Sequence, residues 1–69
     1  MNCLQFALYF WDKNKNYRIY YDGDHVLNMT EPVGKYLPIE EYGKDHILRS
    51  FEDTLYPIDM MRLNRYFNN

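Results

Sequence analysis

The chain contains few of the residues from which small proteins build cross-linked or metal-bound cores. It has one cysteine, Cys3, and two histidines, so no intrachain disulfide can form, and these residues make no ligand pair at the short spacings of a zinc site. Secreted domains of this size usually carry an even set of cysteines, whereas a single cysteine fits a reducing compartment. We therefore expect a cytoplasmic protein without a metal or another cofactor.

Glycine and long apolar runs are also scarce. The three glycines do not have the spacing of a phosphate-binding loop. The longest apolar run extends from Leu4 to Trp11, is interrupted by Gln5, and is far shorter than the roughly 20 residues of a membrane helix. No basic residue precedes this run, as a signal peptide would require. We expect neither a membrane span nor a leader.

What the chain does have is a high apolar content for its size. Its 69 residues include 46% apolar and 19% aromatic side chains, and this composition is too hydrophobic for a disordered chain. The length allows one domain, covering residues 1–69, and excludes a two-domain enzyme. A core of this size rarely supplies more than about 3 to 5 kcal/mol of stability.

The first half of the sequence predicts antiparallel strands. Alternation over residues 4–11 places four large apolar side chains on one face, which we take as the core face: Leu4, Phe6, Leu8 and Phe10. Turn residues at 12–15 connect this strand to a second one at 17–21, and a three-residue turn connects that strand to a third at 25–29. This turn places Tyr21 opposite His25. A two-residue Asp22-Gly23 turn is the alternative, but its register would expose the apolar side chains.

The second half predicts helices. Apolar residues from Ile39 to Leu55 recur at helical spacing, so we expect one amphipathic helix from about 38 to 55, with Gly43 as its weak point. Tyr56-Pro57 interrupts the pattern, and residues 58–67 fit a helix or a strand, with residue types that favour the helix. The expected class is α+β: a small antiparallel three-stranded β-meander followed by one or two helices packed on the sheet.

Side chains that carry catalysis or bind metals are present but form no complete pattern. The segment Asp22–His25 holds two carboxylates and an imidazole, but a calcium loop also needs ligands where the chain has Val26 and Val33. Cys3 could act as a nucleophile beside a histidine, although a cysteine at the head of an apolar segment is more often a buried hydrophobe. We therefore expect a protein that is not an enzyme.

Tyrosine is the most distinctive component, with eight copies. In the predicted sheet, Tyr9, Trp11 and Tyr20 share the face opposite the core, and Arg18 lies on the same face. These residue types are enriched at the energetic centres of protein interfaces, because each combines a large apolar body with a polar tip. We expect this face to bind a partner; the alternative is that a helix covers it as a second core layer.

The charges are distributed unevenly along the chain. Residues 1–21 and 60–69 each carry a balance of +2, whereas residues 22–59 hold nine acidic and three basic side chains. An acidic stretch repels nucleic-acid phosphates but can bind a basic groove on a protein that itself handles nucleic acid. The candidate binding residues are Asp22, Asp24, Glu41, Asp45 and Glu52. The last three form one stripe of the predicted helix, and the alternative is that these charges only keep the protein in solution.

These features predict a small inhibitor or adaptor that docks on a larger protein, with a nucleic-acid enzyme as the favoured class of partner. In size, single cysteine, tyrosine and asparagine content and acidity, the chain resembles the small inhibitors that phages encode against host defence or transcription, such as anti-CRISPR proteins. The resemblance is one of composition, so it assigns no residue a role. The alternative function is a dimer that sequesters a nucleotide or another small ligand, with Arg18, Arg62 or Arg65 on the phosphate.

Overall fold

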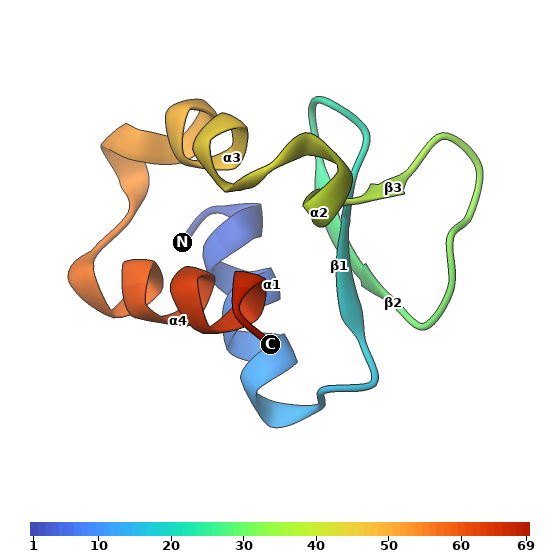
Figure 1. Ribbon diagram of the computed structural model, residues 1–69, viewed down its shortest axis with the longest axis horizontal. Coiled ribbons are helices and arrows are strands. Elements are labelled where there is room, and N and C mark those ends of the chain that lie inside the picture. Colours follow the sequence, from blue (N-terminus) through green and yellow to red (C-terminus); the bar gives the residue numbers. More distant parts are fainter.

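The computed structural model covers residues 1–69 and has the α+β class that the sequence predicts (Figure 1). One long helix precedes the strands, and the other helices follow them. In chain order the elements are α1 (Cys3–Lys13), β1 (Arg18–Tyr21), β2 (Val26–Met29), β3 (Leu37–Pro38), α2 (Ile39–Tyr42), α3 (Lys44–Phe51), the 3-10 helix η1 (Glu52–Thr54) and α4 (Pro57–Phe67). Helices α1 and α4 lie together beside the sheet, and α3 lies above them in the view of Figure 1.

The sheet has three antiparallel strands in the order β2-β1-β3. Strand β1 is central, as predicted, but its second neighbour is β3 rather than residues 4–11, so the predicted meander is wrong. After β2 the chain crosses to the other edge of β1, where the two residues of β3 pair with Tyr20 and Tyr21. Pro38 is tolerated in β3 because this strand lies at the edge of the sheet.

Residues 3–13 form helix α1, so the strand predicted at 4–11 is wrong. A capping box begins the helix: the Asn2 side chain accepts a hydrogen bond from the Gln5 N–H at 2.8 Å, and the Gln5 side chain accepts one from the Asn2 N–H at 2.9 Å. The apolar residues that α1 buries are Leu4, Ala7, Leu8 and Trp11. Their spacing is that of a helical face, so Phe6 and Phe10, which alternation assigned to the core, lie outside it.

The β1–β2 hairpin has a longer turn than the sequence predicts. Tyr21 pairs with Val26, so four residues form the turn, and both predicted registers are wrong. The Asp22 carboxylate stabilises this turn because it accepts hydrogen bonds from the N–H groups of Asp24 and His25 at 2.8 and 2.7 Å. The side chain of Asp22 therefore serves the turn itself.

The helix predicted from about 38 to 55 is broken in two. Gly43 has φ 94° and ψ 149°, a conformation that is not helical and that L side chains rarely adopt, so α2 ends before it and α3 begins after it. Residues 57–67 form helix α4 rather than a strand, which confirms the preference for a helix there. Pro57 lies in its first turn, where a missing N–H costs no helical hydrogen bond.

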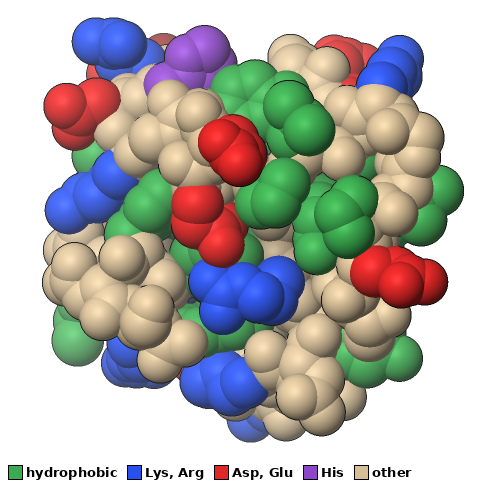
Figure 2. All heavy atoms as spheres, turned by 45° about the vertical axis from the view of Figure 1, so that its right-hand side comes forward, with side chains coloured by type: hydrophobic (Ala, Val, Ile, Leu, Met, Phe, Trp, Pro, Cys, Tyr) green, Lys and Arg blue, Asp and Glu red, His purple; other side chains and the backbone are tan.

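The loop between β2 and β3 leaves apolar side chains on the surface. Val33 in this loop is 59% exposed, and Leu37, the first residue of β3, is about half exposed. Figure 2 shows this side of the molecule, on which a small group of hydrophobic side chains is bordered by acidic and basic ones. Exposed apolar residues of this kind are ordinary on small proteins and do not by themselves mark a site.

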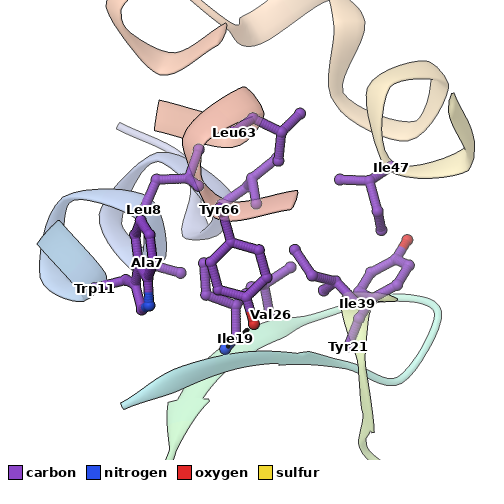
Figure 3. Packing of buried hydrophobic residues seen from close by; sticks show 11 residues of the cluster. Ala7, Leu8, Trp11, Ile19, Tyr21, Val26, Ile39, Ile47, Leu63 and Tyr66 are labelled. Carbon is purple, nitrogen blue, oxygen red and sulfur yellow. Dashed lines mark hydrogen bonds between the residues drawn. The ribbon is translucent and has the colours of Figure 1, made fainter. Parts of the chain in front are cut away.

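The core lies where α1, α4 and the sheet meet, and Tyr66 stands at its centre (Figure 3). Its ring contacts the Trp11 ring edge to face, with centres 4.9 Å apart. Its hydroxyl accepts a hydrogen bond from the Ile19 N–H at 3.0 Å and donates one to Glu40 at 2.9 Å. Because β3 ends before it reaches Ile19, this hydroxyl takes the place of a strand partner. Burial raises the pKa of Tyr66, so its hydroxyl stays protonated across the neutral range.

We expect Tyr66→Phe to lower the free energy of unfolding by about 1 to 3 kcal/mol, because it leaves the Ile19 N–H buried without an acceptor. Tyr9→Phe is the matched control, since Tyr9 is half exposed and should lose less than about 0.5 kcal/mol. Urea unfolding followed by the fluorescence of Trp11 measures both variants. Equal stability of the two variants would contradict the structural role of the Tyr66 hydroxyl.

Candidate functional site

Helix α1 has apolar side chains on two faces. Gln5 is the only polar residue between Cys3 and Trp11, so the helix buries one face in the core and leaves a second apolar face outside. On this second face, Phe6 is 52% and Tyr9 is 45% exposed. A helix with apolar side chains on every face is usually buried on every face. Two hollows flank the exposed face of α1, and they are the candidate sites of the molecule.

The first hollow, which we call the aromatic groove, lies between α1 and β2 and has a volume of about 550 Å³. Phe6, Phe10 and Tyr17 contribute three rings to it; the ring centres of Phe6 and Phe10 are 6.1 Å apart, and those of Phe10 and Tyr17 are 5.4 Å apart. The rest of the lining comes from β2, around Leu27, from His25 and from residues 1–3. None of the lining residues is Asp, Glu, Lys or Arg, so the groove presents a mainly apolar surface.

The second hollow, which we call the polar hollow, lies between the starts of α1 and α4 and has a volume of about 620 Å³. Asp59 lines it and is only 4% exposed; its carboxylate accepts hydrogen bonds from the Gln5 side chain and from the Tyr56 N–H, both at 2.9 Å. Gln5 also donates to the Thr54 carbonyl at 2.6 Å. These groups are bonded to one another and join two helix starts, so we assign them a structural role.

An ion-pair cluster joins the far end of α1 to α4. The Asp12 carboxylate accepts hydrogen bonds from Arg62 at 3.1 Å and from Arg65 at 2.8 Å, and the Lys15 ammonium lies 3.4 Å away. Burial pushes the pKa of Asp12 upward, but the hydrogen bonds from these three cations outweigh it and hold the pKa below its ordinary value of 3.8. The cluster therefore stabilises the ionised carboxylate.

The structure separates the aromatic residues that were predicted to share one binding face. Trp11 is 0% exposed and Tyr20 is also buried, so both belong to the packed interior. Tyr9 is exposed but borders the polar hollow, and Arg18 is held by a hydrogen bond of 2.9 Å to Glu40. The prediction of one shared face is wrong because residues 3–13 form a helix, in which Tyr9 and Trp11 point in different directions.

The predicted acidic residues lie on the surface except for the carboxylate of Asp22. The backbone N–H groups of His25 and Asp24 bind that carboxylate and lower its pKa. The exposed residues are Asp24, Glu41, Asp45 and Glu52. The prediction that Glu41, Asp45 and Glu52 form one stripe of a single helix is wrong, because they lie on α2, α3 and η1. Their role in binding stays a prediction.

Comparison with known protein families, with curated proteins and with solved structures finds no match to this chain. Helices α1 and α4, each of 11 residues, are the longest, and none of the helices combines the length and apolar content that crossing a membrane requires. Cys3 and His25 both line the aromatic groove, and no hydrogen bond joins them.

The aromatic groove contains residues that the sequence did not single out for binding. Alternation assigns Phe6 and Phe10 to the core and gives Tyr17 and Leu27 no role in recognition. The Asn2-x-x-Gln5 capping box is the signal that could have found the groove. A helix that begins there turns Phe6 and Phe10 away from the residues at the buried spacing.

We expect Asp12→Asn to lower the free energy of unfolding by about 1 to 2 kcal/mol at neutral pH, because Arg62 and Arg65 lose a charged partner. The folded-state pKa of Asp12 lies below the unfolded value, so its contribution is full above about pH 4 and is lost as the pH falls through the folded pKa. Urea unfolding at pH 7 and near pH 2 should show a difference that disappears in acid. Glu31→Gln, which removes an exposed carboxylate without an ion pair, is the control; a difference that is the same at both pH values would contradict the assignment.

Proposed function

We propose that the protein is a small non-enzymatic interaction protein, an inhibitor or adaptor that docks on a larger protein through the aromatic groove. The observation that carries this proposal is the second apolar face of α1, where Phe6 is half exposed beside a mainly apolar hollow. Fully burying a large apolar side chain contributes about 1.5 to 3 kcal/mol, and covering Phe6, which is 52% exposed, contributes roughly half of this. A partner that fills the groove would remove Phe6 from water and gain this free energy of burial.

The charges that remain unpaired support a basic partner. Six carboxylates take part in no ion pair: Asp24, Glu31, Glu41, Asp45, Glu52 and Asp53. Only Lys13, Lys44 and Arg49 are unpaired among the basic side chains. An excess of free carboxylates speeds association with a positively charged surface and opposes direct contact with nucleic-acid phosphates. A protein that itself handles nucleic acid fits this description.

We further propose that the protein is cytoplasmic, because it has a single cysteine. Because of its size and composition, we propose that it belongs with the small inhibitors that phages encode against host machinery. The alternative of a nucleotide-sequestering dimer has less support. Its phosphate ligands, Arg18, Arg62 and Arg65, are each bonded to a carboxylate, so a phosphate would have to displace Glu40 or Asp12.

The proposal predicts that Phe6→Ser weakens partner binding at least tenfold, because it removes an aromatic ring from the centre of the contact. Tagged protein captures candidate partners from the source cell or its host, and each candidate is then purified and its affinity measured with purified components. Val33→Ser is the matched control, since Val33 is 59% exposed and lies away from the groove. A partner that binds both variants equally well would place the contact elsewhere on the surface.

The excess of unpaired carboxylates gives a second prediction, which concerns the rate of association with the partner. Replacing Glu41, Asp45 and Glu52 together with Gln should slow association with the same partner about tenfold at low salt and flatten the salt dependence of the association rate. The dissociation rate should change little. Stopped-flow mixing at low and moderate salt measures both rates. An unchanged salt slope would leave these carboxylates with no part in recognition.

A further inference from the structure

We propose that the aromatic groove takes an extended segment of the partner, which adds a strand to the free edge of β2. Strand β2 lies at the end of the sheet order and pairs with β1 alone. The N–H of Asp22 donates to the carbonyl of His25 at 3.3 Å, so these two residues form a hydrogen-bonded pair. In an antiparallel ladder, hydrogen-bonded and non-hydrogen-bonded pairs alternate from there along the strands. In that alternation, Val26 and Asn28 direct their N–H and C=O groups away from β1, toward the groove.

The other side of the central strand β1 shows how this molecule satisfies outward backbone groups. On β1, Ile19 and Tyr21 direct their backbone groups away from β2. The hydroxyl of Tyr66 accepts from the Ile19 N–H, Tyr42 donates to the Tyr21 carbonyl at 3.1 Å, and β3 pairs with the rest. That side of β1 is closed by side chains and a short strand, whereas no side chain bonds the outward backbone groups of Val26 and Asn28 on β2.

The free edge also lacks three of the features that usually prevent strand addition. Exposed edges are commonly protected by lysine, proline or a bulge, and Val26–Met29 contains neither residue and pairs with β1 in continuous register. Because no Asp, Glu, Lys or Arg side chain lines the groove, an uncharged segment matches it, and a charged one would lose hydration without gaining an ion pair to one of these side chains.

The groove runs beside three consecutive residues of β2, Val26, Leu27 and Asn28. A segment opposite β2 needs about four residues at roughly 3.3 Å each, and the groove volume is about 550 Å³. Side chains of a strand alternate, so one set would meet the rings of Phe6 and Phe10 while the other set would lie beside Leu27. The occupant is therefore an extended, uncharged segment that is apolar at alternate positions.

A second copy of this chain does not fit the same edge. Two β2 strands paired about a two-fold axis would lie about 4.8 Å apart and would present the same sheet face to one side. Helix α1 packs on β2, where the Asn28 side chain donates to the Ala7 carbonyl at 3.0 Å. The two α1 helices would then meet over the joint, although packed helices need about 8 to 10 Å between their axes.

The test uses a matched pair of variants of the full chain, Asn28→Pro and Asn28→Ala. Both lose the side-chain bond to Ala7, but only the proline also removes the outward N–H of residue 28, and neither touches the ladder with β1. The probe is a displayed library of short random peptides selected on the unaltered protein. Selected peptides should be apolar at alternate positions, should bind Asn28→Ala, and should bind Asn28→Pro at least tenfold more weakly. Their binding should protect the amide protons of Val26 and Asn28 from exchange.

The proposal rests on the proposed function, and the outcomes separate the two. Selected peptides with helical spacing, equal binding by the two Asn28 variants, or no selected peptide at all would overturn strand addition. If Phe6→Ser loses the captured partner while Asn28→Pro binds it as well as Asn28→Ala does, docking at the groove stands and strand addition falls. Self-association that the proline variant abolishes, measured by sedimentation, would assign the edge to a second copy and would also overturn the proposal.

Discussion

The hydroxyl of Tyr66 makes the contact on which the other parts of the structure depend. It accepts a hydrogen bond from the Ile19 N–H at the point where β3 ends, and it donates one to the Glu40 carboxylate. Without it, the central strand would have a buried donor with no acceptor, at a cost of about 1 to 3 kcal/mol, which is a large share of the stability of so small a core. A side chain from the last helix thus allows a sheet whose third strand has only two residues.

The sequence allowed correct prediction of the type of those elements that turn residues or a proline delimit. Strands β1 and β2 and helix α4 lie where expected, because turn residues and Pro57 mark their limits. Helix α1 was misread because nearly every residue from Cys3 to Trp11 is apolar, so spacings of two and of 3.6 both fit. The polar pair that resolves this ambiguity, Asn2 and Gln5, lies at the start of the run.

The binding surface could be predicted less well, because it depends on which face of α1 the other elements cover. The residue types were informative, since aromatic side chains do border both hollows. Which rings are buried follows from helical geometry and from the packing of α4, and a single sequence shows neither. The turn at Asp22 is a similar case, because one carboxylate that binds two N–H groups lengthens the turn and shifts the register of β2.

The hydrogen bonds that close the fold join residues far apart in the sequence. Gln5 bonds Asp59, and Ile19 bonds Tyr66, over separations of 54 and 47 residues. Such contacts form late, because the entropy of closing a long loop must be overcome first. While the chain is being synthesised, α1 and the first hairpin must therefore wait for α4 to leave the ribosome. During that interval the side of α1 that α4 will cover stays accessible, so the nascent chain is most open to chaperones and to aggregation until α4 packs on it.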